Sequence, residues 1–167
     1  MKVYGFKIYE DDELIHDYVP AKIGDEGFLK DKVTGLTLSP MNPQYLFAAS
    51  ENAEALPYVE STGYQAVVLD YKPNAKSVIE VDTDGLERVK NTSIFGVSDN
   101  SGSCQFHVNS SADANGPGME AYMHSVWGWR MVTGLEKFGQ RVKFMLDVPK
   151  SYAYARKADG TNLGSTN

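Results

Sequence analysis

The sequence contains a single cysteine, Cys104, among its 167 residues. One thiol excludes an internal disulfide bond and any metal site built from several cysteines. A Cys/His nucleophile pair would also need a base supplied by a local motif, and no such motif surrounds Cys104. Because free cysteines are often buried, we interpret Cys104 as a half-buried side chain without a catalytic role.

Long apolar runs are also missing. No run approaches the roughly 18 residues of a membrane span, so we expect no membrane insertion. The opening residues, MKVYGFKIYEDD, lack the apolar stretch and the small-residue cleavage site of a secretory signal. A piece of a larger exported protein would carry no signal of its own either, so composition leaves the compartment open.

Positive charge is sparse, because 16 Lys and Arg residues stand against 22 Asp and Glu residues and give a net charge of −6. The basic residues form no cluster, which argues against nucleic acid as a partner. The three histidines, His16, His107 and His124, are far apart, and none has a metal-ligand spacing. We interpret them as strand residues and predict no histidine metal site.

Alternation of apolar and polar residues is what the sequence has in abundance. In RVKFMLDV, residues 141–148, Val142, Phe144 and Leu146 share one face with Val148, whereas Arg141, Lys143 and Asp147 lie on the other. Residues 3–10 alternate in the same way. A period of two is typical of a strand with one buried and one solvated face.

Short segments of the same kind recur along the chain, separated by turn-forming residues. Further strands are predicted at residues 13–19, 44–48, 65–71, 77–82, 93–97, 105–109, 120–126 and 151–157. Turns are predicted at residues 72–74, 99–102, 115–118 and 159–160. Helix is scarce: residues 83–90 have room for a turn or two, and residues 51–56 are cut short by Pro57. The pattern favours an all-β, antiparallel β-sandwich.

Two parts of the chain resemble parts of a known family. FKIYEDDELIHDYVPA, residues 6–21, and GFLKDKVTG, residues 27–35, resemble the closing strands and turn of concanavalin A-like (laminin G-like) jelly-roll repeats. Such repeats occur in large bacterial surface proteins and some phage tail proteins. YVESTGYQAVVLDYKPNAKSVIEVD, residues 58–82, resembles their opening strands, and residues 93–108 resemble the next hairpin. The resemblance implies a jelly-roll fold but no activity, because a shared framework carries no shared site.

The order of these parts is inverted relative to such a repeat. We expect one domain over residues 1–167, in which residues 1–50 resemble the C-terminal part of a repeat, 51–57 form a connector and 58–167 resemble the N-terminal part. Three explanations compete: a closed, circularly permuted sandwich, a chain that straddles two repeats, and a sandwich completed by a neighbouring molecule. We favour the closed permutant, because jelly-roll termini tend to lie close together at the surface.

An acidic row offers one candidate for catalysis. Glu80, Asp82 and Asp84 alternate and would share one face of a strand, as the two carboxylates of a retaining glycoside hydrolase do. The hydrolase pattern ends in a glutamate that donates the proton, whereas Asp84 ends this row and Gly85 follows it. We interpret the row as the solvated face of a strand and keep a hydrolase or lyase using Glu80 and Asp82 as an alternative.

An aromatic group is the stronger candidate for binding. Tyr122, Trp127 and Trp129 lie close together in sequence, with Arg130 adjacent, and the two tryptophans would point the same way from a strand. Aromatic rings stack on the apolar C–H faces of sugars, while polar neighbours bond the hydroxyls. Tryptophans also dominate cores, so burial of at least one of them is the competing interpretation.

Loops rich in Asp, Asn and Ser, at residues 99–103 and 109–115, have oxygen ligands suited to Ca²⁺ but lack the spacing of a calcium loop. We therefore predict no required cofactor or metal, with Ca²⁺ as the weak alternative.

The sequence thus favours a non-catalytic carbohydrate-binding or adhesion module. We expect it to belong to an extracellular or cell-surface protein and to have a glycan or another cell-surface ligand as its partner. A structural spacer or assembly module, which associates through its sheet edges, is the third hypothesis.

Overall fold

The structure is a computed structural model of the chain. It describes residues 2–38, 46–47, 53–60, 69, 71–84, 92–98, 105–113, 116–123, 126–131 and 140–166. Within residues 46–47 and 92–131 the description covers the backbone. The described part is an antiparallel β structure, and no helix occurs in it. The expectation of an all-β protein is confirmed for these residues.

Fifteen strands make up the described part of the chain. They are β1 (Lys2–Glu10), β2 (Glu13–Ile23), β3 (Glu26–Asp31), β4 (Thr37–Leu38), β5 (Leu46–Phe47), β6 (Glu54–Ala55), β7 (Val59–Glu60), β8 (Ser77–Asp84), β9 (Thr92–Ser98), β10 (Gln105–Asp113), β11 (Gly116–Met123), β12 (Val126–Met131), β13 (Val142–Asp147), β14 (Tyr152–Lys157) and β15 (Asn162–Thr166).

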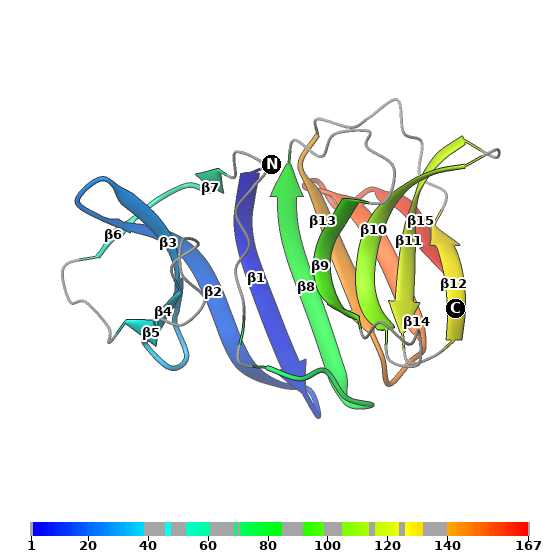
Figure 1. The fold of residues 1–167 in the computed structure, drawn as a ribbon, viewed down its shortest axis with the longest axis horizontal. Helices are drawn as coiled ribbons and strands as arrows, with labels where there is room; N and C mark the ends of the chain where they lie inside the picture. The colour runs from blue at the N-terminus through cyan, green and yellow to red at the C-terminus, as the bar shows by residue number, and fades with distance from the viewer. Residues whose placement is uncertain are drawn as a thin grey trace.

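The larger sheet has eleven strands, nine of them in the order β15-β14-β13-β8-β1-β2-β3-β4-β5 (Figure 1). Its central pair joins segments that are far apart in sequence: Ile8 of β1 lies opposite Ile79 of β8, and Leu146 of β13 lies on the other side of Ile79. Strands from residues 2–38 and from residues 77–84 and 142–166 therefore belong to the same sheet of one molecule.

β1 and β2 pair with each other from the pair Phe6 and Tyr18 to the pair Glu10 and Glu13, and beyond these residues each pairs with a short strand from residues 54–60. Val3 of β1 pairs with Val59 of β7, whereas Ala21 of β2 pairs with Ala55 of β6. The backbone N–H of Leu56 also donates to the carbonyl of Pro20 at 3.0 Å. Part of the segment predicted to be a connector, residues 51–57, is thus built into the sheet as the strand β6.

One face of the larger sheet forms the core. In β8 every second residue is buried, so Ile79 and Val81 alternate with half-buried acids, and the predicted alternation of β13 places Phe144 and Leu146 in the same layer. The fully buried Ile8 lies beside them in β1. Alternating strands of this kind gain their stability from removing one apolar face from water.

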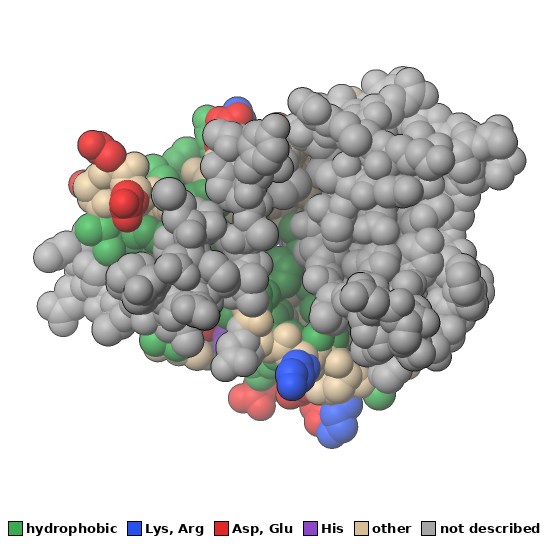
Figure 2. Space-filling view, viewed as in Figure 1, with side chains coloured by type: hydrophobic (Ala, Val, Ile, Leu, Met, Phe, Trp, Pro, Cys, Tyr) green, Lys and Arg blue, Asp and Glu red, His purple; other side chains and the backbone are tan. Residues whose placement is uncertain are grey.

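The second sheet has four strands in the order β12-β11-β10-β9. In Figure 1 it lies in front of the β13–β15 end of the larger sheet, and β12 contacts β14 and β15. Hydrophobic side chains are visible along the middle of the same view in Figure 2, and charged side chains gather at the lower end, where the β1–β2 turn lies. An ion pair between Lys76 and Asp11 belongs to that end.

Most predicted strands are confirmed, with shifted ends. The prediction of one strand over residues 120–126 was wrong, because two strands, β11 and β12, meet there. Residues 116–118 were expected in a turn but begin β11. Pairing with β10 fixes the register of this Gly-Pro-Gly run, and such a run is compatible with an extended backbone. Leu69 and Tyr71 lie outside any strand, while the rest of the strand predicted at residues 65–71 lies outside the described residues.

Candidate functional site

The residues predicted to bind glycans come together on two neighbouring strands. Trp127, Trp129 and Arg130 all belong to β12, and Tyr122 belongs to β11, which pairs with β12. Trp129 lies opposite Ala121, the residue before Tyr122. The backbone therefore brings all four positions into one small area at the β12 edge of the four-stranded sheet.

The pairing of these strands is irregular beside Tyr122. Arg130 pairs with Glu120 and Trp129 with Ala121, but the register shifts before Met123 pairs with Val126. A β-bulge of this kind bends a strand and changes the direction of the side chains next to it. Between these pairs β12 has two residues, Trp127 and Gly128, and β11 has one, Tyr122. The irregularity therefore includes Trp127 as well as Tyr122, and alternation along a regular strand does not define the side-chain direction at either position.

The acidic row of β8 lies on the face opposite the core and is occupied by neighbouring cations. Asp82 accepts two hydrogen bonds from Arg141, from Nε and from Nη2, each at 2.8 Å. Glu80 lies 3.9 Å from Nζ of Lys143. The third acid, Asp84, accepts a long hydrogen bond of 3.5 Å from the hydroxyl of Tyr4. These contacts fit the interpretation of a solvated strand face, and they engage the carboxylates that the hydrolase alternative would use.

Arg141 also stacks on an aromatic ring, since its guanidinium carbon lies 4.0 Å from the centroid of the Tyr4 ring. Tyr4 packs in turn against Tyr58, and Nζ of Lys2 lies 4.3 Å from the centroid of the Tyr58 ring. Two neighbouring aromatic rings are thus flanked by a cation at each end, and such contacts add modestly to stability at exposed positions.

We expect the Arg141–Asp82 pair to contribute little to stability despite its two hydrogen bonds. The side chains are 44% and 21% exposed, and ion pairs in such surroundings contribute about 0.2–1 kcal/mol. A double-mutant cycle with Arg141→Gln and Asp82→Asn, measured by urea unfolding, should give a coupling energy in that range. A coupling energy several times larger would mean that the pair is a structural anchor of the sheet.

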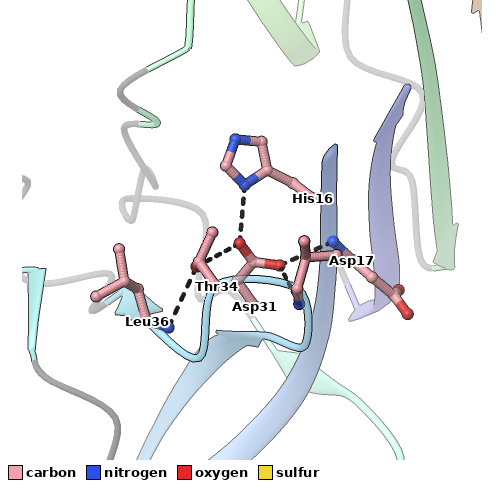
Figure 3. A network of polar contacts seen from close by, with 6 residues as sticks. His16, Asp17, Asp31, Thr34 and Leu36 are labelled. Atoms are coloured by element: carbon pink, nitrogen blue, oxygen red, sulfur yellow. Dashed lines mark hydrogen bonds and ion pairs between the residues drawn. The ribbon is translucent and has the colours of Figure 1, made fainter. Parts of the chain in front are cut away.

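A second polar group surrounds Asp31, at the end of β3 (Figure 3). The Asp31 side chain is 1% exposed. Its carboxylate accepts hydrogen bonds from His16 Nδ1 at 2.8 Å and from the Thr34 hydroxyl at 2.6 Å. The backbone N–H groups of Asp17 and Val33 donate to its other oxygen at 2.9 and 3.0 Å. This network closes the turn at residues 32–34, which lies within the DKVTG sequence.

The pKa of Asp31 results from two opposing effects. Burial acts to raise it, but the hydrogen bonds from His16, Thr34 and the two backbone N–H groups favour the charged form more strongly and hold the pKa at about 2. Burial and the nearby charge of Asp31 raise the pKa of Tyr18 to about 12. Asp31 is therefore a carboxylate and Tyr18 a neutral phenol over the whole physiological range.

Aromatic rings surround the histidine of this network. His16 stacks on Tyr18 with ring centroids 5.3 Å apart, and Tyr71 meets it edge-on at 6.2 Å. The Tyr71 hydroxyl shares a 2.5 Å hydrogen bond with the buried Ser77 hydroxyl. Since His16 lies within β2 and bonds to Asp31, its expected role as a strand residue is confirmed. Sequence reasoning missed Asp31, although the DKVTG turn contained the signal: an Asp followed at two and three positions by a backbone donor and a threonine.

Several candidates are corrected or lie outside the described residues. Residues 109–113 were expected in a loop with oxygen ligands but belong to the strand β10. Residues 99–103, with Cys104, and residues 114–115 lie outside the described part, as does His124. Among the described residues, no group of three or more His, Cys, Asp or Glu side chains is placed to hold a metal ion.

Comparisons with protein-family models, curated proteins and solved structures gave no match to this chain. Within the residues that the structure describes, none of the elements is a helix long and apolar enough to cross a membrane. The candidate sites are therefore judged on their own geometry.

Proposed function

We propose that this chain is a non-catalytic carbohydrate-binding or adhesion module that acts outside the cell or on its surface as part of a larger exported protein. Its ligand is a glycan or another cell-surface molecule, bound at Tyr122, Trp127, Trp129 and Arg130. The observation that carries the proposal is the meeting of these four positions on β11 and β12. Indole and phenol rings offer stacking surfaces to sugars, and a guanidinium donates several hydrogen bonds to hydroxyl groups.

We further propose that the two sheets pack as a jelly-roll sandwich of the concanavalin A-like kind, in permuted order. The contacts of β12 with β14 and β15 support this architecture, as does the position of the smaller sheet over one end of the larger one in Figure 1. The pairing of β1 with β8 supports the permuted order, because it joins the segment of closing type to the segment of opening type. In this arrangement the buried face of β13 and β14 would be covered by the smaller sheet.

Replacing Trp129 with alanine should weaken glycan binding while leaving the fold intact. A glycan array identifies the ligand, and isothermal calorimetry then measures its affinity for the wild type and for Trp129→Ala. Loss of one stacking ring should weaken binding by about 10- to 100-fold, since a well-placed aromatic contact contributes about 1–3 kcal/mol. Circular dichroism should report the same β content in both proteins.

Two outcomes would favour the other hypotheses. No glycan binding together with oligomers that form as concentration rises would favour the assembly module, which associates through its sheet edges. Hydrolysis of a β-glucan that Glu80→Gln abolishes would instead show the acidic row of β8 to be an active site. Tyr152→Phe, on the separate strand β14, is the control and should leave binding unchanged.

A further inference from the structure

The outer face of the larger sheet places two cations directly opposite each other. Lys143 of β13 and Arg156 of β14 are cross-strand partners, so their side chains leave the sheet on the same face. The Lys143 side chain is 45% exposed, and Arg156 is exposed as well. Like charges in directly opposite positions destabilise a pair of strands. An anion held between the two side chains would relieve that repulsion.

Neighbouring carboxylates compensate these cations only in part. Both oxygens of Asp82, the partner of Lys143 on the other side, are taken by Arg141. Glu80 lies 3.9 Å from Nζ of Lys143, which is the outer limit for an ion pair. Among the described residues, no carboxylate forms an ion pair with Arg156. Arg156 is thus the cation of this face that the described carboxylates leave without an ion pair.

The guanidinium of Arg156 is held in place by an aromatic ring. Its central carbon lies 4.1 Å from the centroid of the Tyr154 ring, which is 7% exposed and therefore fixed by its surroundings. A stacked guanidinium keeps its N–H edges free and loses little side-chain freedom when it binds a planar carboxylate through two hydrogen bonds. Ser165 lies opposite Tyr154 on β15 and offers an exposed hydroxyl to a neutral part of the same ligand.

We propose that Lys143 and Arg156 form a binding site for the carboxylate of an acidic sugar, such as a uronic acid, on the outer face of the larger sheet. The carboxylate bonds the Arg156 guanidinium and the Lys143 ammonium together, and sugar hydroxyls lie toward Ser165. This inference rests on the proposed function, because it names a glycan class for the protein. It adds a site that is separate from the four positions on β11 and β12.

Trigalacturonate and its trimethyl ester test the site, because they share the sugar ring and differ in charge. Calorimetry on the whole chain should detect binding of the acid and at least about tenfold weaker binding of the ester, since charged hydrogen bonds contribute about 1.5–3 kcal/mol. The double variant Lys143→Gln/Arg156→Gln should lose about the same factor for the acid. The affinity of the wild type should also fall as salt is added.

Lys157→Gln is the matched control, because it removes one positive charge at the next position of β14, where the side chain leaves the other face of the sheet. Its affinity for trigalacturonate should match that of the wild type. Arg156→Gln alone serves if the double variant is impaired in folding; its melting temperature should change little, because the change removes both a repulsion from Lys143 and a stacking contact with Tyr154. Equal affinity for acid and ester, or unchanged affinity in both Gln variants, would overturn the site.

The remaining outcomes separate this site from the proposed function. If neutral glycans bind, Trp129 is needed for that binding, and trigalacturonate is not preferred, then the proposed function stands and the inference is overturned. Binding of trigalacturonate that needs Lys143 and Arg156 but not Trp129 would keep the inference and move the glycan site from β12 to the outer face. A hexaglutamate peptide that binds more tightly than trigalacturonate would overturn the choice of a sugar, and failure of every glycan would overturn both.

Discussion

Replacing Asp31 with asparagine is expected to lower the free energy of unfolding at pH 7 by about 2–3 kcal/mol. The shift of its pKa from 3.8 to about 2 corresponds to roughly 2 kcal/mol of stability at neutral pH. The asparagine amide would also turn one donor toward the His16 and Thr34 donors, which adds the cost of an unmade buried hydrogen bond. Urea unfolding at pH 7 measures the loss.

The same change should remove part of the pH dependence of stability. Because the folded pKa of Asp31 is lower than the unfolded one, its contribution is complete above the unfolded value and is lost as pH falls through about 4 to about 2. The wild type should therefore lose more stability than Asp31→Asn over that window. Asp25→Asn, in the exposed β2–β3 turn, is the control and should behave as the wild type. Parallel curves for wild type and Asp31→Asn would contradict the assignment.

Replacing Phe144 with alanine is expected to cost about 3–5 kcal/mol, the usual range for truncating a buried phenylalanine. Phe144 is 0% exposed, and Val81 and Ala155 are its partners on the strands at either side. Neither neighbour is long enough to refill the space, so most of the cavity would remain. Since small domains are stable by only about 5–15 kcal/mol, the variant should be close to unfolding at 37 °C.

Met145→Ala is the matched control for this prediction, because Met145 is the next residue of β13 and lies on the opposite, half-buried face. It should cost less than half as much as Phe144→Ala in the same thermal or urea measurement. Equal losses would show that the outer face is packed as tightly as the core. That result would also argue against the access of a ligand to Lys143 and Arg156.

The strands were predictable from sequence wherever alternation was strong. Residues 142–147 carry large apolar side chains at every second position, and their burial follows the prediction, except that Asp147 is buried although it faces away from the core. Its carboxylate accepts hydrogen bonds from the backbone N–H and Nζ of Lys150, which offset the loss of water. A local turn of this kind satisfies a polar group that periodicity assigns to solvent.

Pairing was harder to predict than the strands themselves. The strand β15, of residues 162–166, carries the weakly alternating sequence NLGST and was missed, because its place is defined by pairing with β14 and not by an apolar face. The strands β6 and β7 are two residues each, too short to show any period. Their backbone hydrogen bonds with β2 and β1 come from tertiary structure, which no local pattern encodes.

Of the candidate sites, one follows from residue spacing in the sequence and the other depends on how the strands pair. The meeting of Trp127 and Trp129 on one strand follows from their spacing alone, and the structure adds that Tyr122 is on the neighbouring strand. The opposition of Lys143 and Arg156 could not be read from the sequence, because it depends on the register of two strands. A shift of one residue in that register would have placed the two cations on opposite faces.

The central position of β1 has a consequence for synthesis on the ribosome. β1 can form a hairpin with β2 at once, but its second partner, β8, follows about 70 residues later, which takes on the order of several seconds at usual rates of elongation. During that interval one edge of β1 has no strand beside it and is open to pairing with other nascent chains. Limited proteolysis of ribosome-bound chains that end before Ser77 should therefore find β1 accessible, and chains that extend past Asp84 should protect it.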